Sequence, residues 1–383
     1  KVKINNFTDS RAFALMFLLV FVFISVLLSE DPQRGVVKSI IFLSYVFLYF
    51  YIFVGHVNID SVENTIRFLF FIGIIFALYA SFLYFFQNVI DSENEIAIST
   101  NRGDINVQQS LYDFGFGAVK GIFIPGLNTN TFGVILTSLV FICLFLYSEC
   151  RNRKYRIFYF SILLLFLSEI VMTMSRGALL SLFLGIFYLI IKGWFNVRQL
   201  LLYAIILMVI MTYFQSNHLD AIYQRFLGGV DLIFNLNLDA EYGIGFVDRI
   251  ESQKNTINIF YDNPIFGVGA GNLDGYNLIK NTEHNSYLRV LAELGLFGFM
   301  ALLLFIVGAL RSASIVMKKI RNIPDLSKDL KMLEMLFAIS ITYVFYLNIG
   351  PFLHSFWISI ALLSVTTFLT KKKLNLLQFK DKI

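Results

Sequence analysis

The sequence has few charged residues and only two cysteines. Asp, Glu, Lys and Arg make up 15% of the 383 residues, whereas 57% are hydrophobic and the mean hydropathy is +0.71. A soluble domain rarely exceeds about half apolar residues. Ten-residue segments of alternating polarity, which a transmembrane β-barrel requires, are also missing. These absences exclude an ordinary soluble domain and a β-barrel.

The apolar residues form long, nearly uncharged runs. Each run is close to the roughly 20 residues that cross about 30 Å of hydrocarbon. We therefore predict an all-α polytopic membrane protein with about ten transmembrane helices. The spans are 12–29, 36–54, 66–86, 131–147, 157–174, 177–192, 200–214, 286–310, 332–349 and 353–370. The first run is too long for the apolar part of a cleaved signal peptide.

Basic residues set the expected orientation, because Lys and Arg gather in cytoplasmic loops. Under an N-inside assignment they gather in the inner segments 1–11, 148–156, 192–199, 311–331 and 371–383. Both termini are then cytoplasmic. The net charge of +5 follows from this topology, so no nucleic-acid partner is expected. Cys143 falls within a span and Cys150 in an inner loop, which fits a reducing inner side.

The spans divide the chain into three parts. Residues 1–214 hold about seven transmembrane helices and an outer loop at 87–130, and 286–383 hold about three more and a cytoplasmic tail. Between them, 215–285 form a large outer loop. Apolar residues at mixed helical spacing in 220–234 and 248–271 predict that this loop is a small helical cap on the outer membrane surface. The sequence "DNPIFGVGAGN" at 262–272 predicts a turn after that helix, and its glycines alternatively suit an anion nest.

Residues 157–192 form an almost continuous apolar stretch with inner loops at both ends. As one helix it would be about 54 Å long, too long for a single span. We therefore predict a tight hairpin that turns near "TMSRGA" at 173–178, with Gly177 supplying the turn. Arg176 then lies at the outer tip.

Three outer residues, Arg176, Arg249 and His284, could carry chemistry together. Guanidinium groups donate in a fork to phosphate oxygens, and a histidine accepts a proton near neutral pH. Each residue also has a simpler explanation. Arg176 could reach lipid headgroups, Arg249 could pair with a neighbouring acid, and His284 could cap the following span. Fixed positive charge with a possible base suits a pyrophosphate-bearing lipid at the membrane surface.

Several motifs resemble those of the O-antigen ligase and Wzy-type polymerase superfamily. They are "MSRGALLS" at 174–181, "DRIESQKNTINIFYDNPIFGVGAGN" at 248–272 and "HNSYLRVLAELGLFG" at 284–298. The stretch "GIFIPGLNTNTFG" at 121–133 is similar to an earlier Gly- and Asn-containing segment of that superfamily. The resemblance covers roughly 115–310. Its members often have about twelve spans, more than the ten predicted here.

The resemblance implies an inverting glycosyltransferase that needs no metal or other cofactor. Its donor is a glycan on undecaprenyl pyrophosphate at the periplasmic or outer face. Arg176 and Arg249 match the arginines that stabilise the departing pyrophosphate, and His284 matches the histidine that orients or deprotonates the acceptor hydroxyl. The acceptor is a glycan or a lipid in the bilayer. A chain-length regulator and a flippase of the same pathway are further possible partners.

Weaker candidates are substrate-binding residues with equally simple structural roles. Lys120 could contact the donor or anchor a loop, and Arg225 could contact phosphate or lie on the surface. Asn130 and Asn285 could bind sugar or phosphate oxygens or cap helices. Glu293 could tune the site or pair with Arg289, four residues earlier on the same helix face. Glu169, also within a span, is expected to be buried and paired, with no partner evident.

Three functions follow from this pattern. The chain could polymerise lipid-linked repeat units into an O-antigen, capsule or exopolysaccharide, which the "SRGALL" and "HNSYLRVLAELGLFG" motifs favour. It could instead be a ligase that transfers the finished glycan to lipid A-core or another acceptor. A transporter or flippase would show charges or broken helices at mid-membrane and symmetry between halves. The predicted charges lie mostly at the outer surface, which argues against the transporter.

Overall fold

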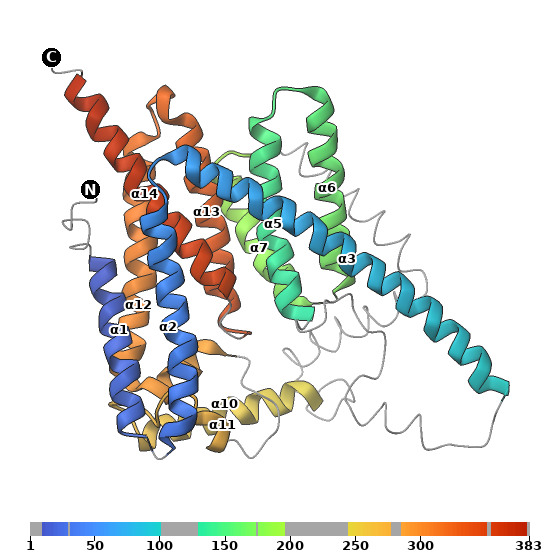
Figure 1. Cartoon of the computed structure of the whole chain (residues 1–383), viewed down its shortest axis with the longest axis vertical. Coiled ribbons are helices and arrows are strands. Elements are labelled where there is room, and N and C mark those ends of the chain that lie inside the picture. The colour runs from blue at the N-terminus through green and yellow to red at the C-terminus, as the bar shows by residue number, and fades with distance from the viewer. Residues whose placement is uncertain are drawn as a thin grey trace. The chain divides into compact units, whose positions relative to one another are not determined.

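The computed structural model describes residues 10–29, 31–100, 129–173, 175–195, 244–276, 285–350 and 354–380 (Figure 1). These residues form helices and short connections. The helices are α1 Ser10–Leu27, α2 Pro32–Gly55, α3 Ile59–Thr100, α5 Thr129–Glu149, α6 Arg153–Met172, α7 Arg176–Ile191, α10 Ile244–Asp262, α11 Leu273–Tyr276, α12 Ser286–Ile320, the 3-10 helix η2 Pro324–Leu326, α13 Ser327–Tyr346 and α14 His354–Lys380.

The membrane class is confirmed, but the count of ten spans is not. Every predicted span except 200–214, which lies outside the described residues, falls on a helix. Five helices are long and apolar enough to cross a membrane, namely α2, α3 as far as Leu83, α5, α6 and α12. Two shorter apolar helices are Ala14–Leu27 and Arg176–Ile191. The backbone of α3 remains helical to Thr100, inside the segment predicted as an outer loop.

The chain divides into two compact units. Unit 1 comprises residues 1–67, 184–192 and 248–383, and unit 2 comprises 68–183 and 193–247. Helices α3, α7 and α10 each contribute residues to both units. We describe each unit by itself.

Unit 1 is built around contacts of α12 with α1 and α14, and of α14 with α2 and α13. Trp357 of α14 is fully buried, and its ring stacks on Tyr45 and Phe305. Phe42 meets the same indole edge-on, with ring centroids 5.7 Å apart. Aromatic pairs of this kind bury large areas and prefer such stacked and edge-on geometries. They fix α2 and α12 against α14.

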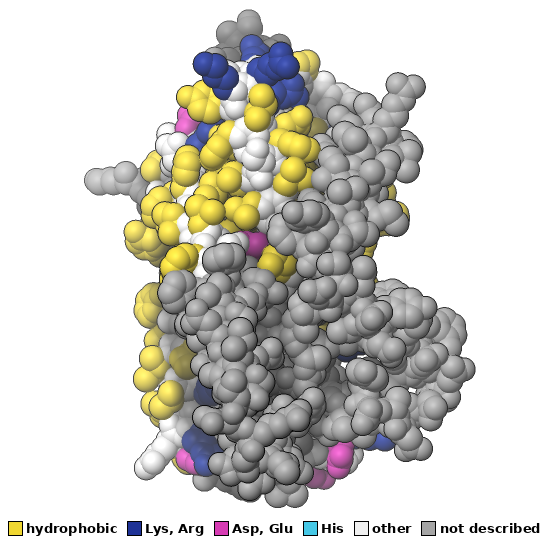
Figure 2. All heavy atoms as spheres, turned by 90° about the vertical axis from the view of Figure 1, so that its right-hand side faces the viewer, with side chains coloured by type: hydrophobic (Ala, Val, Ile, Leu, Met, Phe, Trp, Pro, Cys, Tyr) yellow, Lys and Arg dark blue, Asp and Glu magenta, His cyan; other side chains and the backbone are white. Residues whose placement is uncertain are grey.

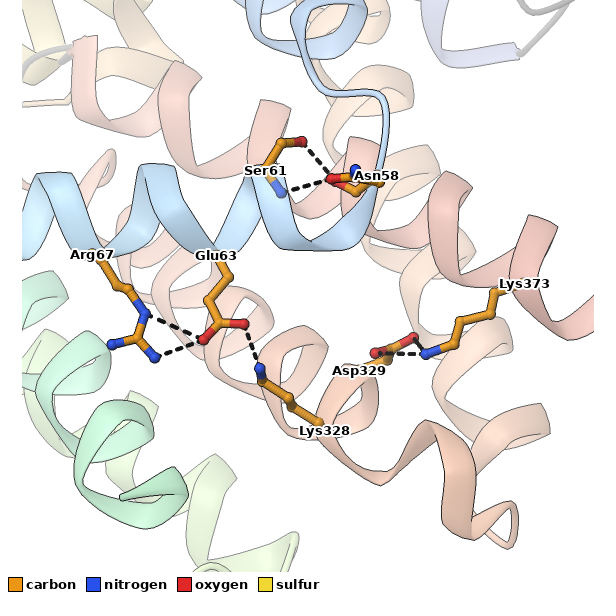
Figure 3. A network of polar contacts seen from close by, with 7 residues as sticks. All are labelled: Asn58, Ser61, Glu63, Arg67, Lys328, Asp329 and Lys373. Atoms are coloured by element: carbon orange, nitrogen blue, oxygen red, sulfur yellow. Dashed lines mark hydrogen bonds and ion pairs between the residues drawn. The ribbon is translucent and has the colours of Figure 1, made fainter. Parts of the chain in front are cut away.

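Ion pairs join three helices of unit 1 at the end predicted to be cytoplasmic (Figure 3). Glu63 of α3 accepts from Arg67 at 2.7 Å and pairs with Lys328 of α13. Asp329 of α13 pairs with Lys373 of α14 at 3.2 Å. Burial raises the pKa of Asp329, and its bond to Lys373 opposes that shift. Two lysines of the predicted inner segments, Lys328 and Lys373, thus have carboxylate partners here.

Unit 2 is organised around α5, which packs as an antiparallel pair with α6 and is largely buried. Phe70 of α3 contacts the rings of Tyr159 and Phe166 of α6. A Cβ on Gly73 of α3 would collide with Leu139 of α5, so the glycine allows the close approach of these helices. On the described part of the face in Figure 2, hydrophobic side chains predominate, and a cluster of Lys and Arg lies at its upper end. That distribution is expected of a membrane protein.

Glu169 of α6 is fully buried, as predicted. Its partner is Ser81 of α3, whose hydroxyl donates to Glu169 Oε1 at 2.6 Å. The second oxygen, Oε2, has no hydrogen-bond partner. A hydroxyl therefore replaces the charged partner that an intramembrane acid usually finds.

The predicted span 286–310 lies within the candidate membrane helix α12, and this helix is interrupted. Gly295 has φ 66° and ψ −170°, which is not helical. The segment before it, residues 286–294, is a short separate helix. The segment after it, 296–320, is about 37 Å long and can cross a bilayer alone. Arg289 and Glu293 therefore belong to the short helix before the break.

Candidate active site

The predicted hairpin is confirmed at the connection between α6 and α7. Helix α6 ends at Met172, and α7 begins at Arg176. The Thr173 N–H donates to the Glu169 carbonyl at 2.8 Å, which closes the last turn of α6. The expectation for Gly177 was wrong, because Gly177 lies in the first turn of α7 and the turn lies before it.

Two local hydrogen bonds from backbone N–H groups to side-chain hydroxyls fix the start of α7. The Ala178 N–H donates to Ser175 Oγ at 3.1 Å, so Ser175 caps the helix. The Ser175 N–H donates to Thr173 Oγ1 at 3.3 Å. Both hydroxyl residues are about 2% exposed. These bonds place Arg176 at the first helical position, where its side chain is exposed.

The position of Arg176 is electrostatically unusual for a helix. The N-terminus of a helix carries partial positive charge and favours anionic side chains there. A cation at this position gains nothing from the dipole. Arginine side chains and helix N-termini are both groups that can bind an anion such as phosphate.

Gly133 of α5 brings the earlier family-like stretch against this turn. A Cβ on Gly133 would lie 2.7 Å from Ala178 Cβ and 3.0 Å from Thr173 Oγ1. The absence of a side chain therefore lets α5 pack directly on the α6–α7 connection. The sequence reasoning singled out "GIFIPGLNTNTFG" but missed Gly133. The feature that could have indicated this contact is a glycine one helical turn after the start of a predicted span, where the chain does not need to change direction.

In unit 1, the predicted cap helix is α10, and the backbone of Arg249 lies within it. The side chain of Arg249 is outside the described residues. The predicted turn follows the helix, and Gly267, Gly269 and Gly271 have φ of 70°, 97° and 80°. Of the two alternatives for this loop, the structure supports the turn. The Val268 and Gly269 N–H groups donate to carbonyls of α12 and so are not available to an anion.

His284 lies outside the described residues, and Asn285 directly after it caps α12. Asn285 Oδ1 accepts from the N–H groups of Tyr287 and Leu288 at 3.0 and 3.1 Å. The capping alternative for Asn285 is therefore present in the structure. The short helix that follows begins one residue after Asn285.

The predicted pair of Arg289 and Glu293 is confirmed. Arg289 Nε donates to Glu293 Oε1 at 2.9 Å, and the two side chains are 22% and 11% exposed. A pair with little solvent contact holds its geometry better than a surface pair. Whether Glu293 also acts on substrate stays a prediction.

The remaining candidates stay predictions. Lys120 and Arg225 lie outside the described residues. Asn130 lies in the first turn of α5 and is half-buried. Arg176 falls in unit 2, whereas Arg249 and His284 fall in unit 1. The hypothesis that the three share one site is therefore still to be tested.

A comparison with models of known protein families finds a match, which covers part of the chain. Residues 161–303 match a family model described as O-antigen ligase. This match supports the resemblance of residues 161–303 to the superfamily of O-antigen ligases and Wzy-type polymerases. The search of curated proteins finds no match.

The matched segment runs from α6 into α12, so it contains the α6–α7 turn and α10. It also contains the loop 263–272, with Gly267, Gly269 and Gly271, which we call the glycine loop. Arg176, Arg249 and His284 all fall within it, whereas Lys120 and Asn130 precede it. The resemblance seen in the sequence motifs is confirmed. Enzymes of this superfamily are ligases and polymerases of the glycosyltransferase type.

Proposed function

We propose that this chain is a polysaccharide polymerase of the O-antigen ligase superfamily. It joins repeat units carried on undecaprenyl pyrophosphate into an O-antigen, capsule or exopolysaccharide. The reaction takes place at the outer face of a bacterial inner membrane, with both termini in the cytoplasm. A chain-length regulator and a flippase of the pathway are its expected partners.

The observation that carries the proposal is the placement of Arg176. An exposed arginine at the first position of α7 has no benefit for helix stability. It does present a fork of donors beside the N–H groups of a helix start, which suits a pyrophosphate. The buried Ser175 cap and the close packing of Gly133 hold this position.

The proposed chemistry is a single displacement with inversion. The acceptor hydroxyl oxygen bonds to the anomeric carbon as the bond from that carbon to the pyrophosphate oxygen breaks. His284 takes the proton of the hydroxyl, or orients it for loss to solvent. Undecaprenyl pyrophosphate leaves with the bonding electrons. Arg176 and Arg249 stabilise the charge that develops on it, so the step needs no metal.

The test uses purified protein with its lipid-pyrophosphate-linked repeat unit, EDTA and no other acceptor. A ladder of lengthened glycans on a gel is expected for the natural protein and not for His284→Ala. His218→Ala is a matched control, because this histidine is in the same predicted outer loop and should leave the ladder intact. A ladder that depends on added Mg²⁺, or that His284→Ala still makes, would contradict the proposed chemistry.

The alternative is a ligase, which the description of the matching family favours. The same assay separates the two functions. A ligase would make no ladder alone but would transfer the glycan once lipid A-core or another acceptor is added. An absence of transfer with every acceptor would instead favour a transporter.

A further inference from the structure

The break in α12 is closed by backbone hydrogen bonds from the glycine loop. In an unbroken helix, the carbonyls of Ala292 and Glu293 would accept from N–H groups four residues later. Here they accept from Val268 N–H at 2.9 Å and Gly269 N–H at 3.0 Å. The Leu296 N–H, which starts the second segment, donates to the Pro264 carbonyl at 2.9 Å. We call these three bonds between 264–269 and 292–296 the backbone bridge.

The bridge explains how a helix can break beside a membrane. Polar backbone groups without partners are costly there, and each needs a substitute partner when a helix is interrupted. Groups on both sides of the break find substitutes in one loop. The interruption is therefore a built feature of the fold and not a frayed helix end.

Two glycines make the bridge possible. Gly295 has φ 66° and ψ −170°, a region essentially confined to glycine. A Cβ on Gly295 would overlap the Ile265 carbonyl, and a Cβ on Gly267 would overlap the backbone of Glu293. Because neither glycine has a side chain, the backbones of segments 264–269 and 292–296 can approach closely enough to form the bridge.

The short helix 286–294 is also held at its other end. The Ser286 N–H and Oγ donate to the carbonyls of Leu347 and Gly350 at 2.8 and 2.7 Å. The Tyr287 hydroxyl donates to the Val344 carbonyl at 2.9 Å. These acceptors lie at the end of α13, so the short helix is fixed at both ends.

The glycine loop is in turn attached to α1. The Ala270 N–H donates to Ser25 Oγ at 3.3 Å, and Asn272 Nδ2 donates to Ser29 Oγ at 2.6 Å. Ser25 and Asn272 are both nearly fully buried. The bridge therefore rests on α1 and α13, two helices of the unit 1 core.

We infer that the backbone bridge is a positioning device for the glycosyl transfer, with Gly267 and Gly295 as its positioning residues. The inference rests on the proposed function. Helix α10, which carries Arg249, leads into segment 264–269 of the bridge. The short helix that follows His284 leads into segment 292–296. The bridge therefore sets the start of the short helix directly after His284, and with it the end of α10. Gly267 and Gly295 have no side chains, so they would act through the backbone that they position.

The experiment compares Gly295→Ala and Gly267→Ala with Gly193→Ala. Gly193 is the matched control, because it has φ 79° and nothing within 4 Å of an added Cβ. It adds the same kind of backbone strain without a collision. Initial release of undecaprenyl pyrophosphate gives kcat and KM for the lipid-linked donor. Amide hydrogen exchange of 264–269 and 292–296 reports the bridge independently of activity.

For both bridge variants, kcat should fall at least about tenfold, while KM for the donor changes less than about threefold. Exchange at Val268, Gly269 and Leu296 should be slow in the natural protein and fast in the variants. Gly193→Ala should change neither. In a His284→Ala background, Gly295→Ala should cause no further loss of the residual rate, because a device acting through His284 has nothing left to position.

Three results would overturn the inference. Fast exchange of these amides in the natural protein would mean that the bridge does not persist. Full kcat in both variants would mean that the bridge does not position the reacting groups. If Gly295→Ala lowered the rate by the same factor in the natural and the His284→Ala backgrounds, the bridge would not act through His284. If the natural protein transfers no glycan to any acceptor, the proposed function fails, and slow exchange would then leave the bridge as a feature of the fold alone.

Discussion

Replacement of Gly133 by alanine tests whether the α6–α7 turn is held by close packing. The new Cβ would lie 2.7 Å from Ala178 Cβ, whereas ordinary contacts of this kind start near 3.4 Å. The α5 backbone and the turn must therefore separate by about 0.7 Å. Overpacking of this size costs about 1–3 kcal/mol. Ala178 lies two residues after Arg176, so the arginine should move with it.

The expected result is a larger loss of activity than of stability. Misplacement of a catalytic group by about 1 Å can lower the rate about a hundredfold. We expect glycan transfer by Gly133→Ala to fall about 10- to 100-fold, with the Tm in detergent lowered by only a few degrees.

The assay measures the initial rate of undecaprenyl pyrophosphate release and the Tm of the same preparation. Gly55→Ala is the control, because an added Cβ at Gly55 has nothing within 4 Å. An unchanged rate for Gly133→Ala, at normal Tm, would refute the idea that this contact sets Arg176. Loss of all folded protein would be followed up with Gly133→Ser, which brings the same Cβ and can donate a hydrogen bond to Thr173.

Three further changes test other parts of the structure. Arg176→Lys keeps the charge but loses the fork, so transfer should fall at least about tenfold, whereas Arg156→Ala at the opposite end of α6 should leave the rate unchanged. Glu169→Gln should keep the bond from Ser81 and a normal Tm; Glu169→Ala leaves that hydroxyl without an acceptor and should lower the stability by about 1–3 kcal/mol. For Asp329, whose pKa burial raises, the contribution to stability is present below the unfolded pKa of about 4 and is lost as pH rises through the folded pKa. The Tm of the natural protein relative to Asp329→Asn should therefore decline as pH rises above about 4, and a parallel pair of curves would contradict this.

The sequence alone predicted a structural feature correctly where one physical constraint allowed only one arrangement of the chain. The 157–192 stretch is too long for one span and has inner loops at both ends, so a hairpin followed from length alone. The same reasoning misassigned Gly177, because it treated the glycine as the turn. A serine cap and a threonine hydroxyl closed the connection instead. Local capping chemistry can replace a glycine and leaves little trace in hydropathy.

Other features depend on contacts that a single sequence does not reveal. The apolar run across Gly295 is continuous, so nothing in it indicated a break; the break requires a loop more than twenty residues earlier to supply partners. Ser81 and Glu169 are 88 residues apart, and no pattern in the sequence indicates that they form a pair. For the three principal site residues, the motifs supplied the residue types and the order along the chain. Their mutual geometry is a tertiary property.

The backbone bridge has an evolutionary consequence. Its three hydrogen bonds join main-chain atoms, so they make no demand on the side chains of Val268, Ala292, Glu293 or Leu296. Selection on the bridge should therefore act on Gly267 and Gly295, where any Cβ meets backbone, and should leave the flanking residues free to drift. Descendants of this chain that acquire new sugars or acceptors could change the surface of the short helix extensively while keeping the same two glycines.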